Sequence, residues 1–347
     1  MHLYKAEIQR ALKHEKPGQC VPIWELEFQL WGQFTQKPFI VGEEFNKLTS
    51  AEKDRAIGLN TEVFVEVSER LHFAALTIPG GYWEVAPGHP AYYWLPQEYR
   101  LGQAKALYAA LNDRLLLIAN TGGVMCMPDA NNYVDFSYML FDAPEKVGQM
   151  ARDCIASGIR NMDEFADIGF QAVLTASDVA DNRGPFFSPD QMARFVTPFI
   201  KQYASAAKAR NLYSFMHTDG NVTAFMDVIS KSGLDALQGL DPVAGMNMRV
   251  AQQQYKQTLA MCGNVDCGLL LTGTPESVFN HTQTLLKECG RDGSFILGAS
   301  NAVQQEVPVE NYSAIVEAWI DMNSENHHAR EPTDQGTAVD TSANPRG

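Results

Sequence analysis

Short apolar segments recur along the chain, and each is followed by a turn and then by a stretch with helical periodicity. Strands buried in parallel sheets have continuous apolar sequences, and their alternation with helices is typical of βα units. The segments are 20–24, 73–78, 115–119, 172–175, 213–216, 236–237, 258–262 and 294–297. Eight such units predict an α/β protein with a single (β/α)8 barrel of the TIM type.

Helices are expected between these segments. Helical periodicity predicts them at 51–70, 103–111 and 144–165. Ser188 suits the N-cap of a helix that starts at Pro189, and we expect this helix to run unbroken to Ala209. In the same way, Thr274 and Pro275 begin the helix before the last strand.

The two ends of the chain differ from the barrel pattern. Residues 1–13 alternate charged and apolar positions at helical spacing, which predicts an N-terminal helical extension. After Met322 the sequence becomes polar and loses its periodicity. We therefore expect a barrel domain over residues 1–323 and a flexible polar tail over 324–347.

Charge and composition indicate which classes of partner are disfavoured and in which compartment the protein is expected. The net charge of −14 disfavours a nucleic acid or an anionic membrane surface as the main partner, because either would require a basic face. We find neither the apolar stretch of a signal peptide nor a run of about 18 apolar residues. The six cysteines are scattered, without the density of a disulfide scaffold. A cytoplasmic protein with reduced thiols is expected.

Polar residues follow the predicted strands, where the catalytic groups of such barrels lie. We expect them to form one polar pocket at the mouth of the barrel. The candidates for catalysis are Glu25, Glu27, Asp178, His217 and Asp219. The candidates for binding a substrate are Trp24, Tyr82, Trp83, Asn120, Asp181, Asn182, Gln238, Asn264 and Asn301.

Two pairs of candidates alternate along a strand. His217 and Asp219 would point to the same side, where they could share a metal ion, although a histidine held by a neighbouring carboxylate has the same spacing. Glu25 and Glu27 would both project into the barrel mouth if the first strand continues. Two buried carboxylates have raised pKa values and suit proton transfer, whereas metal ligation and a solvated pair are the alternatives.

Cys262 and Cys267 do not have the spacing of a zinc finger. Cys262 is interpreted as a buried, inert residue. Cys267 is the better candidate for a ligand, and it could complete a zinc site across the barrel with His217 and Glu25. A site that binds no metal is the alternative.

Four segments resemble the uroporphyrinogen decarboxylase superfamily, which includes that decarboxylase and corrinoid-linked methyltransferases. They are VPIWELE (21–27), DVADNRGPFFSPDQMARFVTPF (178–199), HTDGN (217–221) and GNVDCGLLLTGTPESV (263–278). The resemblance extends from residue 21 to residue 322. It implies a TIM barrel with its active site at the C-terminal ends of the strands.

The chain departs from both branches that the resemblance suggests. The decarboxylase has an arginine-containing motif at the first strand that grips the carboxylates of its substrate, whereas WELEFQLW (24–31) has two glutamates and no arginine. These glutamates would repel a polyanion. The methyltransferases bind zinc through a His-x-Cys pair at the fifth strand and a cysteine near the eighth. Here these positions are His217, Asp219 and Asn301.

The resemblance therefore favours a methyltransferase that moves a methyl group from a small methylated donor to a corrinoid carried by a partner protein. A decarboxylase acting on a tetrapyrrole or another acid is the first alternative, and a non-catalytic barrel that binds a corrinoid or tetrapyrrole is the second. Phe28, Trp31, Tyr82, Trp83, Tyr92, Tyr93 and Trp94 are expected to form an aromatic wall for the donor, with packing at an interface as the alternative. A homodimer surface is expected around Trp31, Phe34 and Phe39.

Overall fold

A curled parallel sheet of seven strands forms the centre of the protein, in a computed structural model that describes residues 2–78, 95 and 97–328. The strands are β1 (Ala75–Thr77), β2 (Leu116–Asn120), β3 (Ala172–Ala176), β6 (Tyr213–Thr218), β7 (Ala236–Gly239), β8 (Ala260–Cys262) and β9 (Phe295–Ile296), and they are neighbours in this order. All the pairs are parallel. A separate antiparallel hairpin consists of β4 (Ala180–Asp181) and β5 (Gly184–Pro185). Seven of the eight predicted strands are thereby confirmed.

The first predicted strand, 20–24, is present only as bridges between the two edges of the sheet. Ile23 pairs in parallel with both Phe73 and Leu297, which precede β1 and follow β9. The Trp24 N–H donates to the Leu297 carbonyl over 2.9 Å. Pro22 has no N–H to donate, which limits the ladder at this point. The fold is thus TIM-barrel-like, with seven strands and a bridging segment.

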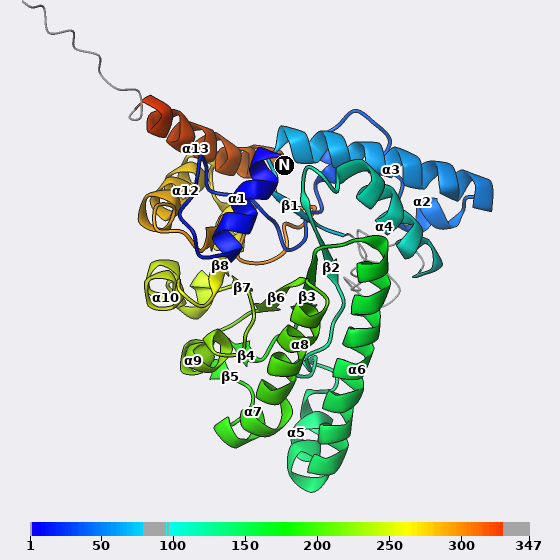
Figure 1. Cartoon of the computed structure of the whole chain (residues 1–347), viewed down its shortest axis with the longest axis vertical. Coiled ribbons are helices and arrows are strands. Elements are labelled where there is room, and N and C mark those ends of the chain that lie inside the picture. Colours follow the sequence, from blue (N-terminus) through cyan, green and yellow to red (C-terminus); the bar gives the residue numbers. More distant parts are fainter. Residues whose placement is uncertain (1, 79–94, 96, 329–347) are drawn as a thin grey trace, which may run out of the picture.

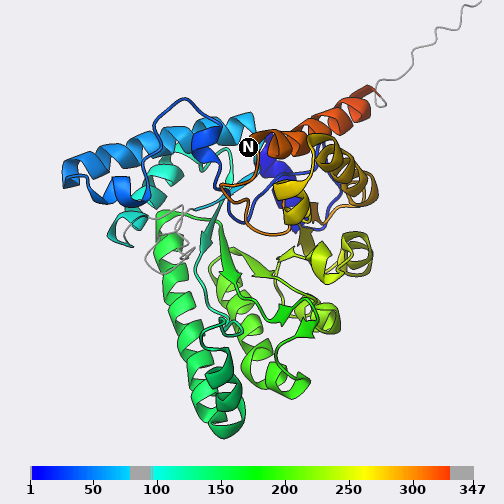
Figure 2. The same ribbon diagram turned by 180° about the vertical axis from the view of Figure 1, so that it is seen from behind.

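Helices surround this sheet (Figures 1 and 2). They are α1 (Leu3–Leu12), α2 (Gly42–Asn46), α3 (Ser50–Arg70), α4 (Gln97–Leu111), α5 (Tyr133–Asp142), α6 (Pro144–Ile168), α7 (Pro189–Phe195), α8 (Thr197–Ala209), α9 (Met226–Ser230), α10 (Met248–Tyr255), α11 (Cys267–Thr272), α12 (Pro275–Cys289) and α13 (Val309–His328). Short 3-10 turns lie at Trp31–Gln33, Thr223–Phe225 and Pro242–Ala244. None of the helices described here is long and apolar enough to cross a membrane.

The helix predicted from Pro189 to Ala209 is in fact two helices. The Ser188 hydroxyl accepts a hydrogen bond from the Gln191 N–H, so the predicted N-cap is confirmed. The helix ends at Phe195, and α8 then begins with Pro198 in its first turn. Pro198 has no N–H to donate to the Arg194 carbonyl, and its ring would clash with that carbonyl in a continuous helix, so an unbroken helix was the wrong prediction here.

Two apolar cores lie on opposite faces of the curled sheet. The inner core contains Leu116, Leu174 and Phe215 from alternate strand positions, and α1 packs against it through Ile8 and Leu12. The intervening residues, such as Met216 and Leu237, belong to the outer core beneath the surrounding helices. Because side chains alternate along a strand, a residue two positions after Phe215 also faces inward. This residue is His217.

The aromatic residues near the N-terminus are part of the outer core. Phe28, Trp31 and Phe34 are buried, and the Phe28 ring lies 5.0 Å from the Trp31 ring and 4.8 Å from the Tyr312 ring. Phe39 is half-buried against Phe64. Phe28 and Trp31 therefore do not form the predicted aromatic wall, and Trp31 and Phe34 are not exposed as the predicted dimer surface requires. Tyr82, Trp83, Tyr92, Tyr93 and Trp94 lie outside the described residues.

The C-terminal helix extends further than the sequence predicted. The polar tail was expected from residue 324, but α13 continues to His328. The remainder of the predicted tail, 329–347, lies outside the described residues.

Candidate active site

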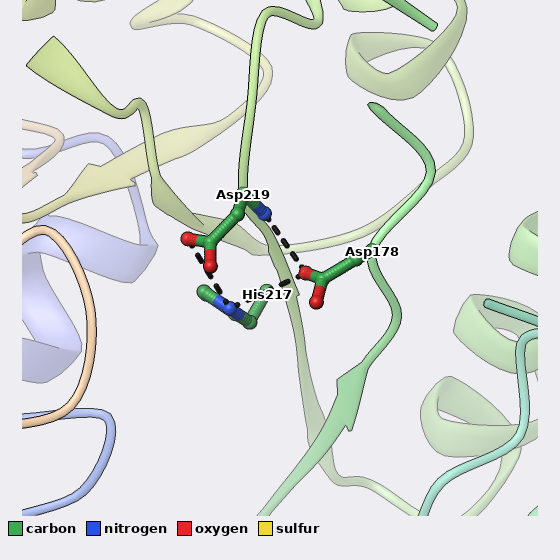
Figure 3. Close-up of side chains that lie close together, drawn as sticks. All are labelled: Asp178, His217 and Asp219. Carbon is green, nitrogen blue, oxygen red and sulfur yellow. Dashed lines mark hydrogen bonds and ion pairs between the residues drawn. The ribbon is translucent and has the colours of Figure 1, made fainter. Parts of the chain in front are cut away.

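Asp178, His217 and Asp219 come together at the C-terminal ends of two neighbouring strands (Figure 3). The Nε2 atom of His217 lies 3.5 Å from Oδ1 of Asp178 and 3.6 Å from Oδ1 of Asp219. The Asp219 N–H also donates to Oδ1 of Asp178 over 2.9 Å. We call these three residues the Asp–His–Asp group. One donor atom from each lies within 4.8 Å of the others, which is close enough to bind one metal ion.

The turn after β6 places Asp219 opposite Asp178. Gly220 has a φ of +80°, and a Cβ atom there would lie 2.5 Å from the Ala180 carbonyl oxygen. Only glycine fits this conformation and this close approach. The Asn221 N–H then donates to the Asp181 carbonyl, so the turn is fixed against the β4–β5 hairpin.

Gln238 determines which nitrogen of His217 carries the proton. The Gln238 Nε2 group donates to the Ala299 carbonyl over 3.0 Å, which fixes the orientation of the amide. Its Oε1 atom therefore faces Nδ1 of His217, 2.5 Å away. Because an amide oxygen only accepts hydrogen bonds, Nδ1 must be the donor. In the neutral imidazole, the Nε2 lone pair then points at the two aspartates.

Asn301 orients the carboxylate of Asp219. Its Nδ2 group donates to Oδ2 of Asp219, while its Oδ1 atom accepts from the Ala302 N–H. Burial raises the pKa of Asp219 to about 6, with further increases from Asp178 and Asp241, whereas His217 and the hydrogen bond from Asn301 lower it. The predicted substrate residues Gln238 and Asn301 thus hold the Asp–His–Asp group.

The Asp–His–Asp group borders an open hollow of about 510 Å³. Its polar lining comes from Asp178, Asp181, Asn182, Arg183, Asp219 and Asp241, and we call it the acidic hollow. The side chains of Asp178 and Asp219 are 40% and 32% exposed, whereas that of His217 is only 6% exposed. The group is therefore reached from its carboxylate side. The predicted residues Asp181 and Asn182 line the hollow, whereas Arg183 was missed although it follows them directly.

Glu25 does not project into the acidic hollow as predicted. It is 4% exposed, and its carboxylate accepts hydrogen bonds from the Ala299 N–H and from the Tyr312 hydroxyl on α13. It lies on the same side of the chain as Ile23 in the outer core, because Trp24 occupies the inner one. Burial raises the pKa of Glu25 to about 8, against the effect of its two donors.

Glu27 is half-buried and accepts a hydrogen bond from the Gln29 amide over 3.0 Å. Burial raises its pKa to about 7, and the hydrogen bond from Gln29 opposes this. The raised pKa predicted for both glutamates agrees with these directions. A shared position at the barrel mouth does not, because Glu25 is turned toward α13.

The two cysteines flank the same loop. Cys262 is fully buried in the inner core, in agreement with its interpretation as an inert residue. Cys267 begins α11, where its sulfur accepts a hydrogen bond from the Ser300 hydroxyl over 3.5 Å, and burial raises its pKa. Among the described residues, His217 is joined by Asp178 and Asp219 and not by the predicted ligands Glu25 and Cys267.

Three other predicted binding residues make contacts within the fold. Trp24 is buried against Phe215 and donates from Nε1 to the Thr77 hydroxyl. Asn264 is buried and donates to the Leu240 carbonyl. Asn120 is half-buried and accepts from the Gly122 N–H.

The sequence profile of the family described as Uroporphyrinogen decarboxylase (URO-D) matches residues 98–321, which is more than half of the chain. The chain belongs to the uroporphyrinogen decarboxylase family. The match begins after the bridging segment and includes the whole Asp–His–Asp group.

Curated relatives agree with this membership, and a solved structure shares the fold. A uroporphyrinogen decarboxylase from Anaeromyxobacter sp. is 24% identical over 235 residues, which cover 63% of this chain and 62% of that protein. One from Coxiella burnetii is 26% identical over 186 residues, covering 52% and 48%. The chain therefore matches less than two thirds of the length of these relatives. The solved structure of a methyltransferase from Methanosarcina mazei has a TM-score of 0.68 at 16% identity and covers 93% of this chain and 99% of its own, which shows the same fold.

Proposed function

We propose that this member of the uroporphyrinogen decarboxylase family is a methyltransferase. It moves a methyl group from a small methylated donor to a corrinoid carried by a partner protein, and a divalent metal, zinc before others, is bound by Asp178, His217 and Asp219. The proposal rests on the orientation of the His217 imidazole. Its Nδ1–H donates to Gln238, so Nε2 faces the two carboxylates.

The donor atoms of the Asp–His–Asp group fit a divalent ion. Nitrogen of histidine and oxygen of aspartate are zinc ligands, and catalytic zinc sites have three protein ligands and an open position. Nε2 of His217 lies 3.5 and 3.6 Å from the two carboxylate oxygens, so the three atoms can bind one cation between them, and the negative charge of the carboxylates favours it. Because no thiolate belongs to the group, harder ions such as Mn²⁺ are also suitable.

A metal held by Asp178, His217 and Asp219 would act as a Lewis acid and would polarise the oxygen, nitrogen or sulfur atom that bears the methyl group. Gln238 holds the proton of the neutral imidazole on Nδ1, which leaves Nε2 available to a metal, and Asn301 holds Asp219 in its orientation. The acidic hollow admits the donor next to the exposed side of the two aspartates. The heteroatom would keep the electron pair of its broken bond to the methyl carbon, and a corrinoid in the Co(I) state would supply the pair for the new bond.

Decarboxylation of a tetrapyrrole is the second candidate, because the relatives at 24% and 26% identity are named as uroporphyrinogen decarboxylases. The lining of the acidic hollow is unfavourable for it. Among the described residues that line it, Asp178, Asp181, Asp219 and Asp241 face a single cationic side chain, that of Arg183. A substrate with many carboxylates would be repelled by this surplus of negative charge.

The test is to incubate the protein with zinc, cob(I)alamin and one donor at a time from methoxylated aromatics, methylamines and thioethers. We expect methylcobalamin with at least one donor, and loss of this product in the His217→Ala variant. Asp235→Asn is the matched control, because Asp235 is a partly buried aspartate that binds Ser214 outside the group. Carbon dioxide release from a carboxylated tetrapyrrole, with no methylcobalamin from any donor, would reverse the assignment.

A further inference from the structure

A buried chain of hydrogen bonds connects helix α13 to the side of His217 that faces away from the acidic hollow. The Tyr312 hydroxyl donates to Glu25 Oε1 over 2.9 Å, and the Ala299 N–H donates to Glu25 Oε2 over 2.8 Å. On the other side of the same residue, the Ala299 carbonyl accepts from Gln238 Nε2. Gln238 Oε1 then accepts from His217 Nδ1.

Every member of this chain is at most 5% exposed. Water therefore cannot replace a lost partner, and an unsatisfied buried donor or acceptor is costly. The amide of Gln238 has two orientations, and only the one that donates to Ala299 presents an oxygen to His217. The position of the Ala299 carbonyl thus selects the tautomer of the imidazole.

Glu25 is the side chain that binds the N–H of Ala299, whose backbone also forms a parallel bridge with Val265. Its carboxylate accepts the Ala299 N–H, and the adjacent Gly298 packs directly on this segment, because a Cβ there would lie 2.2 Å from the Trp24 carbonyl oxygen. An apolar side chain would fill the same buried space without the desolvation of a carboxyl group. A carboxyl group at this point is explained by its hydrogen bonds with Ala299 and Tyr312.

We propose that Glu25 and Tyr312 are positioning residues that act through Ala299 and Gln238 to keep His217 as the Nδ1–H tautomer, with Nε2 directed at Asp178 and Asp219. The consequence for metal binding rests on the proposed function. The consequence for the tautomer does not, and it can be measured in the protein without metal.

The first experiment measures the His217 tautomer by ¹⁵N NMR of the metal-free protein, at a pH where the imidazole is neutral. We expect the Nδ1–H form in the wild type, a mixture of tautomers in Glu25→Met, and restoration of the Nδ1–H form in Glu25→Gln. The glutamine carbonyl can accept from Ala299 while its amide donates to the Tyr312 oxygen. Gln238→Leu is the positive control, because it removes the direct partner of His217.

Two matched controls replace a buried glutamate and a buried tyrosine that lie outside this chain of hydrogen bonds. Glu7 is a buried glutamate that accepts hydrogen bonds from the Gly18 and Gln19 N–H groups, so Glu7→Met also removes a carboxylate with two donors. Tyr203 is a fully buried tyrosine paired with the Thr121 hydroxyl, so Tyr203→Phe is compared with Tyr312→Phe. We expect neither control to change the tautomer. A folded Glu25→Met protein with an unchanged tautomer would overturn the proposal.

If Glu25→Met does not fold, the double variant Glu25→Leu and Tyr312→Phe decides, because replacing both partners by apolar groups of similar shape is close to neutral for stability. A mixture of tautomers in the double variant would support the proposal, and an unchanged tautomer would overturn it. The second readout is the affinity for Zn²⁺ alone, which we expect to fall about 10-fold when Glu25 is replaced by an apolar residue and less than about 2-fold for Glu7→Met. Failure of the wild type to bind Zn²⁺ would count against the proposed function only, because the tautomer measurement still decides the role of Glu25.

Discussion

His217 donates its Nδ1 proton to the side-chain oxygen of Gln238 on the neighbouring strand, and this leaves Nε2 directed at Asp178 and Asp219. Metal-binding histidines usually have such a partner on the second nitrogen, since it fixes both the tautomer and the orientation of the ring. The arrangement is therefore the one that the proposed metal site requires, with the two carboxylates exposed toward the acidic hollow.

The amide of Gln238 is expected to determine metal affinity. Gln238→Leu leaves His217 without its acceptor, and Zn²⁺ affinity should fall about 10- to 100-fold, as for other groups that hold a metal-binding histidine. Titration with Zn²⁺ by calorimetry measures this. An unchanged affinity in a folded Gln238→Leu protein would show that the hydrogen bond does not prepare His217.

Removing either carboxylate of the Asp–His–Asp group should weaken metal binding strongly. We expect Asp178→Asn and Asp219→Asn each to lower Zn²⁺ affinity by about 100-fold or more, because an amide oxygen carries no charge to offset that of the ion. Asp181→Asn is the comparison, since Asp181 lines the same hollow but binds the N–H groups of its own hairpin turn. Equal losses in all three variants would indicate a general charge effect instead of ligation.

Gly220 should be intolerant of a side chain because of the close approach to the hairpin. Gly220→Ala is expected to lower the free energy of unfolding by about 2 kcal/mol or more, of which about 1 kcal/mol comes from the positive φ alone. Gly245→Ala separates the two effects, because Gly245 has the same φ of +80° and a Cβ atom there would have no neighbour within 4 Å. Denaturant unfolding measures both variants, and equal losses would contradict the role of the contact with Ala180.

Glu25 should make stability depend on pH in a defined direction. Its pKa is raised from 4.5 to about 8 in the folded protein, mainly by burial. Between these values the folded state keeps a proton that the unfolded state has released, so stability is greatest below the lower value and decreases as the pH rises toward the upper one. Glu25→Gln has no such proton. Between about pH 5 and pH 8 the wild type should therefore lose unfolding free energy relative to Glu25→Gln. Parallel curves of unfolding free energy against pH for the two proteins would contradict the raised pKa.

The strands could be predicted because buried parallel strands are continuous apolar runs, and even the short segment that became β7 was recognised. The pairing of His217 with Asp219 also follows from alternation along one strand. Asp178 could be named as a candidate but not as the third member of the group. Its place depends on the register of β3 with β6, in which Ala176 lies beside His217, and a sequence alone does not contain that register.

The errors at the first strand have one physical cause. The alternation of Glu25 and Glu27 predicts a shared direction, but not which face of the sheet that direction meets. Trp24 occupies the inner core, so Glu25 is turned outward to Tyr312, a residue far away in the sequence. The aromatic residues Phe28 and Trp31, which come next in the sequence, also lie in the outer core. Contacts with α13 decide these positions, and they are not visible in a local pattern.

The central claim is that Asp178, His217 and Asp219 bind a divalent metal, and the most direct measurement is the metal content of the purified protein. After incubation with Zn²⁺ and removal of the excess, elemental analysis should find about one zinc per chain in the wild type and in Asp235→Asn, and almost none in His217→Ala. A wild type without bound zinc, manganese or cobalt, or a His217→Ala variant that keeps the full amount, would contradict the account.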